Sequence, residues 1–322
     1  MKLAFIIDSI AKLDPGHDSS VAMIEAAQKL GHQVWITEAS QLSIIKGKAW
    51  GYLQRVNLKP VKLVDGYWQA ELDWYRVESE VLTCLEEMDA VFMRTDPPVT
   101  VPYLYTTYIL DLIDRNKTLV LNSPKGLRTA NEKVYALQFT SVIPETIVSQ
   151  DKAVIAKFVE EKQFAVIKPL GGKGGEGILF LEKGDRNFNS IIEVSTQRGR
   201  EPVMVQEYLP AAKQGDKRII LLEGKPIGAV NRVPSGNEFR GNMAVGGKAV
   251  KIDITEREQE ICALVAPQLI ADDLYFVGID VIGGYLTEVN VTSPTGIREI
   301  DRLNGVSLGE QVIEWLEAKL SK

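Results

Sequence analysis

The stretch Ile167–Gly177 reads IKPLGGKGGEG, and five of the seven residues from Gly171 to Gly177 are glycine. Glycine-rich loops expose successive backbone N–H groups, which is typical of phosphate-binding sites. The strand-like segment before the loop contains Lys168, whose positive charge would lie beside the same space. The stretch therefore predicts a binding site for a nucleotide polyphosphate, and its context decides which kind.

Gly172–Gly177 also fits the dinucleotide pattern G-x-G-x-x-G, which requires a helix directly after the loop. The residues after this loop, ILFL at 178–181, are strand-like, so the loop joins two strands. A P-loop requires G-x-x-x-x-G-K-[ST], but Gly174 follows Lys173. The HRD and DFG motifs of a protein kinase are absent from the sequence. A glycine-rich flap that folds over a triphosphate remains. The plainer alternative is a flexible hairpin tip, although so many glycines cost backbone entropy.

The composition is that of an ordinary soluble globular protein, with 322 residues, 45% hydrophobic residues and 25% charged residues. This length allows two or three domains. The net charge is −6 and no basic block is present, so we expect no nucleic-acid partner. No segment approaches the roughly 18 apolar residues of a membrane span, so we expect no membrane partner either. An acidic protein can still bind a nucleotide if its cations converge on one cleft.

Two histidines, His17 and His32, and two cysteines, Cys84 and Cys262, are the only ones in the chain. So few histidines argue against zinc sites and histidine-based triads, which leaves Lys, Arg, Asp, Glu and Asn for the chemistry. Both cysteines occur in helical-looking stretches, and we predict that they are small buried hydrophobic residues. They cannot form a disulfide framework, and the segment MKLAFIIDSI reads as a strand rather than a signal peptide, so we expect a cytoplasmic protein.

The order of strand-like and helix-like segments predicts three units. Residues 1–122 alternate between strands and helices, with Asp18 capping the first helix, which predicts an α/β fold with a Rossmann-like parallel sheet. Residues 123–202 form a smaller unit that contains the glycine flap, and 203–322 form a third unit. We expect a helix within Ser123–Phe139, with Lys133 on it. The Gly- and Asn-rich stretch Pro234–Gly247 predicts a mobile loop.

A β-hairpin in the third unit places acidic residues on both strands. Glu288 and Asn290 are two residues apart and share one face of a strand, and Asp280 on the partner strand could lie across from them. Two carboxylates and an amide oxygen suit Mg²⁺ bridging nucleotide phosphates. A solvated strand face would also contain alternating polar residues. However, the neighbouring Val, Ile and Leu residues indicate a buried sheet, where a carboxylate needs a cation or a partner.

The order of motifs NEK, IKP with the glycine loop, VQEYL, GDKR, NRV, RGN and GID…TEVNVTSPTGIREI resembles that of the bacterial glutathione synthetases of the ATP-grasp superfamily. The resemblance covers essentially the whole chain, including DSSVAM and MRTDPP near the N-terminus. Its most specific part is Glu288–Ile300. It implies an ATP-grasp fold after an N-terminal Rossmann-like domain.

The resemblance also implies roles for individual residues, with ATP as co-substrate and Mg²⁺, or alternatively Mn²⁺, as cofactor. The implied metal ligands are Asp280, Glu288 and Asn290. The implied catalytic residues are Arg218 and Arg232, near the transferring phosphoryl group. The implied ATP-binding residues are Lys133, Lys168, Gly171, Gly172, Gly174, Gly175, Gln206, Glu207, Tyr208, Leu209 and Asp216. Within this set, Gln206–Leu209 match the hinge that reads adenine, and Glu207 matches the carboxylate that binds ribose. Lys133, considered alone, would be an ordinary surface lysine.

The implied reaction is ATP-dependent ligation of γ-glutamylcysteine and glycine through an acyl phosphate, with Pro234–Gly247 as a lid that excludes water. The implied substrate-binding residues are Asp18, Ser19, Arg94, Arg240, Ser293, Thr295 and Arg298. Helix capping by Asp18 and Ser19 and ion pairing by the arginines are the competing explanations. The chain has Thr95 where the family often has a second basic residue, which puts one peptide contact in doubt.

Members of the family assemble, so we expect a homo-oligomer, either a dimer or a tetramer. Trp50, Tyr52 and Trp74 are candidates for its interface, or for the core. Two other functions remain open. Another ATP-grasp ligase, joining two D-alanines or adding glutamates to a protein, would use the same ATP machinery, although DSSVAM and MRTDPP favour glutathione. A regulatory protein that only binds nucleotide would be expected to lack a metal ligand or a flap lysine, and this chain has all of them.

Overall fold

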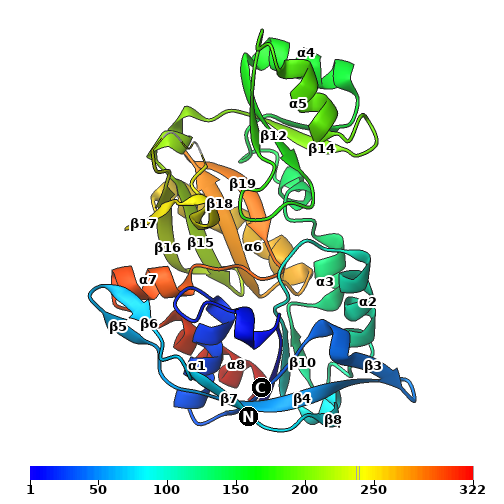
Figure 1. The fold of residues 1–322 in the computed structure, drawn as a ribbon, viewed down its shortest axis with the longest axis vertical. Coiled ribbons are helices and arrows are strands. Elements are labelled where there is room, and N and C mark those ends of the chain that lie inside the picture. Colours follow the sequence, from blue (N-terminus) through cyan, green and yellow to red (C-terminus); the bar gives the residue numbers. More distant parts are fainter. Residues whose placement is uncertain (237, 239, 322) are drawn as a thin grey trace.

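The structure is a computed structural model that describes residues 1–236, 238 and 240–321. Its three main sheets follow one another along the longest axis of the molecule (Figure 1). The N-terminal sheet lies at one end, a small four-stranded sheet lies at the opposite end, and a five-stranded sheet lies between them. Their order in space explains why a site between the sheets draws residues from the entire chain.

The N-terminal sheet has a parallel core because short buried strands alternate with helices that cover its faces. The predicted Rossmann-like parallel sheet is confirmed, and the structure adds antiparallel strands at the β4 edge. The strands run in the order β10-β9-β1-β2-β4-β3, with β7 and β8 also pairing with β4. Their bounds are β1 (Lys2–Ile6), β2 (Gln33–Thr37), β3 (Leu42–Ile45), β4 (Lys48–Leu58), β7 (Tyr75–Val77), β8 (Val81–Cys84), β9 (Ala90–Met93) and β10 (Leu119–Leu121). A separate hairpin consists of β5 (Lys62–Val64) and β6 (Tyr67–Gln69).

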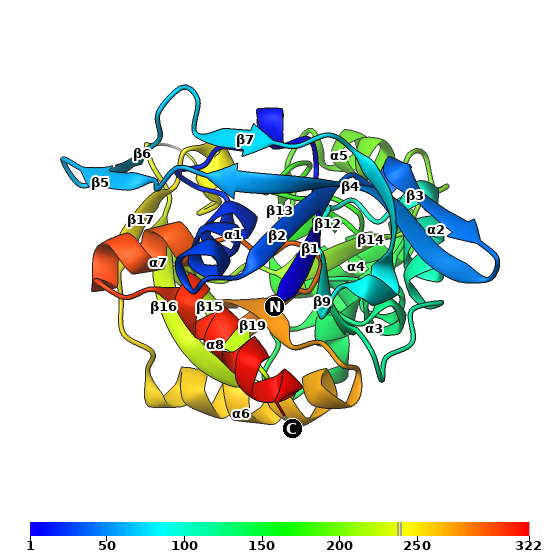
Figure 2. The same ribbon diagram turned by 90° about the horizontal axis from the view of Figure 1, so that it is seen from below.

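Helix α1 (Ser19–Lys29) starts where the sequence predicts, because the Asp18 side chain accepts a hydrogen bond from the Val21 N–H group. The C-terminal helix α8 (Leu308–Leu320) runs beside α1, as Figure 2 shows. A side chain in place of Gly309 would come within 2.8 Å of the Ala22 carbonyl oxygen, so the two helices approach closely at this position. The end of the chain is therefore packed against its beginning. The three-unit division of the sequence stays a prediction.

The small sheet is antiparallel, in the order β11-β14-β12-β13, and α4 and α5 pack on it. The glycine loop joins β12 to β13, which confirms that it lies between two strands. The bounds in this region are β11 (Thr146–Ser149), α4 (Lys152–Lys162), β12 (Phe164–Pro169), β13 (Leu179–Glu182), α5 (Phe188–Ser195) and β14 (Val203–Glu207).

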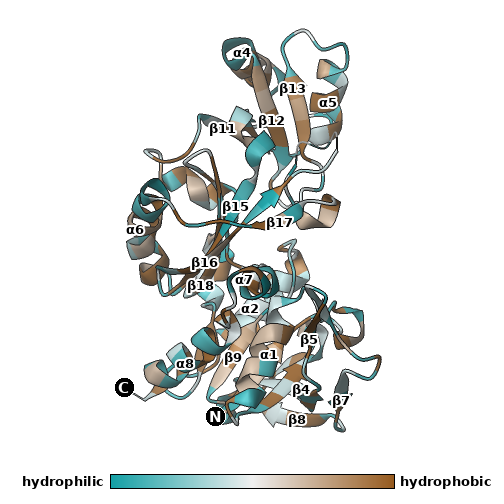
Figure 3. Cartoon of the chain, turned by 90° about the vertical axis from the view of Figure 1, so that its left-hand side faces the viewer, coloured by the Kyte–Doolittle hydropathy of each residue, from teal (hydrophilic) through white to brown (hydrophobic). Residues whose placement is uncertain are grey.

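The middle sheet is also antiparallel, in the order β17-β16-β15-β18-β19. Hydrophobic residues are concentrated in buried strands such as β9 (Figure 3), whereas the edge strand β17 has an exposed lysine at each end. Charged edge strands resist pairing with other chains. The bounds are β15 (Asp216–Leu222), β16 (Lys225–Val233), β17 (Lys248–Lys251), α6 (Glu256–Ala271), β18 (Phe276–Ile282), β19 (Tyr285–Asn290) and α7 (Ile297–Asn304).

Two expectations about local structure were wrong. Cys84 ends strand β8 rather than lying on a helix. The helix expected within Ser123–Phe139 is interrupted: α3 (Pro124–Thr129) ends, and a 3₁₀ helix, η4 (Val134–Gln138), follows. The Asn131 side chain accepts hydrogen bonds from the N–H groups of Lys133 and Val134, which competes with helical bonding. The interruption places Lys133 at the start of η4, where its side chain can reach the cleft. The remaining helix of the N-terminal unit is α2 (Val101–Leu110), and the other 3₁₀ helices are η1 (Ile10–Lys12), η2 (Ala39–Gln41), η3 (Leu85–Glu87), η5 (Pro210–Gln214) and η6 (Met243–Val245).

The buried Asn122 connects the N-terminal sheet to the middle sheet. Its amide Nδ2 donates to the carbonyl oxygens of Phe276 and Val291, both at 2.8 Å, and its Oδ1 accepts from the Phe276 N–H group at 2.9 Å. The Asn122 side chain is only 4% exposed. Loss of the amide would therefore leave these backbone groups without a hydrogen-bond partner and out of reach of water.

We expect Asn122→Ala to lower the free energy of unfolding by about 2–4 kcal/mol, because it leaves buried polar groups unpaired. Chemical denaturation would measure this. Asn189→Ala, on the exposed surface of α5, serves as the control and should change stability by less than about 0.5 kcal/mol. Equal stabilities of the two variants would show that Asn122 does not hold the sheets together.

Candidate active site

A cavity of about 560 Å³ lies where the three sheets meet. Its walls come from the loop before α1, from the glycine flap and β14 of the small sheet, and from β15, β16, β18 and β19 of the middle sheet. The lining residues include sixteen of the nineteen predicted site residues outside the flap, together with Gly172, Gly174 and Gly175.

The wall from the small sheet combines the flap with Lys168. Gly174, Gly175 and Gly177 have positive φ angles of 59°, 85° and 69°, which favour glycine. Lys168 projects from β12, and its Nζ donates to Gln206 Oε1 at 2.8 Å. Burial lowers the pKa of Lys168 below its ordinary value, against the opposing effect of Glu288. A group that has been partly stripped of water in this way is well placed to bind an anion.

The end of β14 supplies Gln206, Glu207, Tyr208 and Leu209, and all four line the cavity. The N–H groups of Glu207 and Tyr208 donate to the carbonyl oxygens of Glu145 and Phe164, which fixes this segment against its neighbours. The Tyr208 ring also packs edge-on against Phe180, with ring centroids 5.0 Å apart. The segment is therefore a fixed edge against which a flat aromatic ligand could lie.

Lys133 connects the flap to the middle sheet. Its side chain is buried, and its Nζ donates to the Gly172 carbonyl oxygen at 2.7 Å and to Glu288 Oε1 at 3.0 Å. The two predicted phosphate-binding lysines and the predicted metal ligand Glu288 thus line one cavity.

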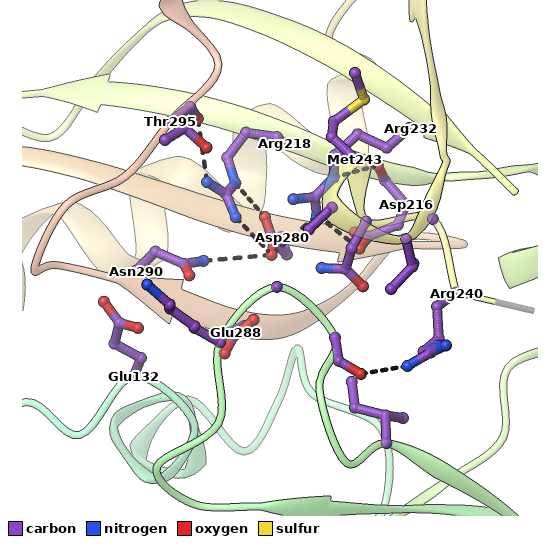
Figure 4. A pocket seen from close by; sticks show the side chains of 18 of the residues that line it. Glu132, Asp216, Arg218, Arg232, Arg240, Met243, Asp280, Glu288, Asn290 and Thr295 are labelled. Atoms are coloured by element: carbon purple, nitrogen blue, oxygen red, sulfur yellow. Dashed lines mark hydrogen bonds and ion pairs between the residues drawn. The ribbon is translucent and has the colours of Figure 1, made fainter. Parts of the chain in front are cut away.

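The floor of the cavity is a charged network centred on Asp280 (Figure 4). Arg218 makes a bidentate contact with the Asp280 carboxylate, at 2.5 and 3.0 Å, and Arg232 approaches the same carboxylate at 3.0 Å. Burial would raise the pKa of Asp280, but the two guanidinium groups hold it below its ordinary value. Arg232 also pairs with Asp216 at 2.6 Å. Burial raises the pKa of Asp216 above its ordinary value, although the Arg232 guanidinium opposes this rise.

The three predicted metal ligands occupy adjacent strands, and Asp280 lies opposite Glu288 as expected. The Asn290 amide donates to the Gly278 carbonyl oxygen at 3.2 Å and to Asp280 Oδ2 at 3.3 Å. Oxygen donors of this kind suit a divalent cation. Among the described residues, no group of three or more His, Cys, Asp or Glu side chains forms a metal cluster, so the fit depends on the amide oxygen of Asn290 as well.

Glu132 lines the cavity but was missed by the sequence analysis. Its Oε1 accepts from the N–H groups of Val291 and Thr292 and from the Thr292 hydroxyl, at 2.8–3.0 Å. Burial raises its pKa, and the nearby Glu288 raises it further. Its position beside Lys133 in the NEK segment was the only available signal. His17 and Glu299 also line the cavity and were missed.

The predicted substrate-binding residues fall into two groups. Asp18, Arg240, Ser293 and Thr295 line the cavity. Ser19, Arg94 and Arg298 do not line it, and neither does the flap residue Gly171.

The buried Arg94 donates to Ser20 Oγ and to the Pro294 carbonyl oxygen, both at 3.0 Å. Arg298 donates to the Pro15 carbonyl oxygen and pairs with Glu25. Ser19 accepts a hydrogen bond from the Ile297 N–H group. These three side chains join the N-terminal unit to the segment around α7, and their roles in substrate binding stay predictions.

Comparison with solved structures identifies the fold of this chain. The D-cycloserine synthetase DcsG superposes with a TM-score of 0.66 at 14% sequence identity, covering 99% of this chain and 100% of that chain. The ATP-grasp ligase PsnB, solved with its minimal precursor, gives a TM-score of 0.64 at 16% identity, covering 98% of each chain. At such low identity the likeness shows the fold alone, which is the ATP-grasp fold.

Sequence comparisons identify the particular family. The model of the prokaryotic glutathione synthetase N-terminal domain matches residues 1–128, and that of the ATP-grasp domain matches residues 132–305. The glutathione synthetase of Synechocystis sp. is 67% identical over 98% of this chain and 99% of its own length. That of Nostoc sp. is 65% identical over 99% of both. The chain belongs to the prokaryotic glutathione synthetase family, and its activity is ATP-dependent glutathione synthesis.

We expect Asp280→Ala to lower the free energy of unfolding by about 3–5 kcal/mol, because it leaves the charges of Arg218 and Arg232 buried without their shared partner. Glu288→Gln is the matched variant, since its side chain is more exposed and keeps its shape, and we expect a change below about 1 kcal/mol. Thermal or chemical denaturation of both variants tests this. Similar losses in the two would contradict the central role of Asp280.

Proposed function

We propose that glutathione synthesis in this protein proceeds through an acyl phosphate formed in the cavity between the three sheets. The cysteinyl carboxylate of γ-glutamylcysteine attacks the γ-phosphorus of ATP, and ADP leaves. The glycine amine then attacks the carbonyl carbon, loses a proton, and displaces phosphate. The observation that supports this proposal is the convergence of Lys133, Lys168, the glycine flap and the Asp280–Glu288 strand face on one cavity.

The nucleotide lies, in this proposal, between the flap and the middle sheet. The flap N–H groups and the two lysines bind its phosphates, and the partly dehydrated Lys168 is a strong partner for an anion. The backbone of Gln206–Leu209 reads adenine, and Glu207 binds the ribose hydroxyls. Asp216 acts through Arg232, with which it pairs.

The divalent cation that the family requires is Mg²⁺ in this proposal, with Mn²⁺ as the alternative. Glu288, Asn290 and Asp280 would hold it, because they present hard oxygen donors on one face of β18 and β19. When bound, the ion neutralises charge on the nucleotide phosphates. Glu288 pairs with Lys133, so binding of the cation by Glu288 would leave the lysine available for the phosphates.

Arg218 and Arg232 are the proposed catalytic residues. Both are buried, and their shared contact with Asp280 fixes their orientation. Fixed cations stabilise a transferring phosphoryl group and a tetrahedral oxyanion without having to reorganise during the reaction. Arg218 also donates to the Thr295 carbonyl oxygen at 3.2 Å, which ties it to the segment proposed to bind glycine.

Water must be kept from the acyl phosphate, and the proposed lid is Pro234–Gly247. Positions 237 and 239 of this segment lie outside the described residues. Arg240 donates to the Gly175 carbonyl oxygen of the flap at 2.7 Å. A side chain at Gly175 would meet Asn242 Oδ1 at 2.7 Å. These contacts support a lid and flap that close together over nucleotide and dipeptide.

The remaining predicted contacts concern glycine and the dipeptide. Ser293 and Thr295 would bind the glycine carboxylate, and Asp18 and Arg240 the dipeptide, since all four line the cavity. Ser19, Arg94 and Arg298 would act by holding the cavity walls.

No helix among the described residues is long and apolar enough to span a membrane. We also propose a cytoplasmic homo-oligomer; both cysteines are unpaired and buried, which suits a reducing compartment.

Phosphate release from ATP tests the reaction directly. The protein is mixed with ATP, Mg²⁺ and γ-glutamylcysteine, and release is measured with and without glycine. Glycine-dependent release with formation of glutathione supports the proposal. Release stimulated only by D-alanine would assign the chain to another ATP-grasp ligase. No turnover at all, with ATP still bound, would indicate a regulatory nucleotide-binding protein.

We expect Glu288→Gln to lower kcat by about 100-fold or more while the protein stays folded, because it removes a proposed carboxylate ligand of the cation. Steady-state kinetics over a range of Mg²⁺ concentrations, with circular dichroism as the folding control, measures this. Glu314→Gln, an exposed change on α8 outside the cavity, should keep kcat within about threefold. A wild-type rate for Glu288→Gln at saturating Mg²⁺ would contradict the role.

A further inference from the structure

His17 lies on the cavity wall formed by the loop before α1, and none of the roles above includes it. Its Nδ1 contacts Glu299 Oε1 of α7 at 2.5 Å. The His17 side chain is 38% exposed, whereas that of Glu299 is 9% exposed. The imidazole therefore lies at the surface of the cavity, and the buried Glu299 carboxylate contacts its Nδ1 atom.

The surrounding contacts fix this pair in place. Arg298, next to Glu299, donates to the Pro15 carbonyl oxygen at 3.1 Å, and the Ile297 N–H group donates to Ser19 Oγ at 3.3 Å. The start of α7 is thus bonded to the loop on both sides of His17. A ring held in this way has a defined orientation, which is the usual requirement for a binding residue.

The neighbouring charges favour the protonated imidazole. The hydrogen bond with Glu299 raises the pKa of His17 above its ordinary value, burial opposes this, and the carboxylates of Asp14 and Asp18 add to the rise. Lys12, five residues before His17, also lines the cavity. The second ring nitrogen, Nε2, makes no hydrogen bond to any of the described residues. A protonated His17 therefore has one N–H donor left for a ligand.

The ligand that suits this wall has an anionic and a cationic group close together. His17 offers a positive donor, and Asp14 and Asp18 offer carboxylates on the same wall. The γ-glutamyl linkage leaves the α-carboxylate and α-ammonium groups of the glutamyl residue free, at the opposite end of the dipeptide from the reacting cysteinyl carboxylate. Glycine fits less well here, because its carboxylate must lie beside the reacting centre.

We propose that His17, oriented by Glu299, binds the α-carboxylate at the γ-glutamyl end of the dipeptide substrate. This proposal rests on the proposed function. His17 is a substrate-binding residue that takes no part in the chemical steps, and Glu299 is a positioning residue that acts through it.

Steady-state kinetics with His17→Gln tests the contact. We expect KM for γ-glutamylcysteine to rise about 10- to 100-fold, because one charge-assisted hydrogen bond is lost. KM for ATP should stay within about threefold, since the nucleotide lies against the flap. The matched control is His32→Gln: His32 also pairs with a glutamate, Glu317, at 2.9 Å, but it does not line the cavity. We expect no change in its KM values.

The pH dependence separates binding by His17 from a structural role. Because the folded-state pKa of His17 is raised, its charge is present below that pKa and is lost as the pH rises through it. KM for γ-glutamylcysteine should therefore rise between about pH 6 and about pH 9 in the wild type. In His17→Lys the charge persists, so KM should stay low and nearly constant over that range. In Glu299→Gln, the rise in KM for γ-glutamylcysteine should begin at a lower pH than in the wild type.

Asp301 titrates in the same range, because burial raises its pKa to about 7, and it lies two residues beyond Glu299 in α7. Asp301→Asn therefore belongs in the series. A pH dependence that persists in His17→Lys and disappears in Asp301→Asn would overturn the proposal, as would an unchanged KM in His17→Gln. A wild-type protein without glycine-dependent turnover would instead contradict the proposed function, so the two failures can be told apart.

Discussion

The contact of one carboxylate, Asp280, with two buried guanidinium groups is the interaction on which the rest of the site depends. Arg218 and Arg232 lie on neighbouring antiparallel strands, and Asp280 lies on the strand at the other side of β15. A buried arginine without a partner is strongly unfavourable. Here the positive charges of Arg218 and Arg232 are balanced by the carboxylates of Asp280 and Asp216. The sheet can in this way hold two guanidinium groups in fixed positions at the cavity, where the proposed reaction would develop phosphate and oxyanion charge.

The same principle applies to the outer part of the cavity. Lys133 is held between Glu288 and the Gly172 carbonyl oxygen, and Lys168 rests on Gln206. Each cation thus has a partner that a more highly charged ligand can replace. We infer that ATP and its cation exchange these contacts for stronger ones. An acidic chain with a net charge of −6 can then bind a polyanion, because the cations converge in one place.

Local patterns predicted much of this arrangement from the sequence. The strand-like residues on both sides of the glycine loop excluded a dinucleotide fold, and the spacing of Glu288 and Asn290 predicted a shared face opposite Asp280, as the register confirms. Contacts between distant segments could not be predicted. Glu132 binds the backbone beyond β19, and His17 meets Glu299 across 282 positions of the chain. No local pattern marks such pairs, because they arise only when the sheets pack together. The break in the helix before η4 was missed for a related reason, since the Asn131 side chain replaces helical bonds there.

The proposed chemistry requires one nucleoside triphosphate to lie between Lys133, Lys168, the flap and the Asp280–Glu288 strand face. A crystal structure with a non-hydrolysable ATP analogue and Mg²⁺ tests this most directly. We predict that both lysine Nζ atoms lie within hydrogen-bond distance of phosphate oxygens and that Glu288 coordinates the ion. A polyphosphate bound elsewhere, with the Lys133–Glu288 pair still intact, would contradict the account.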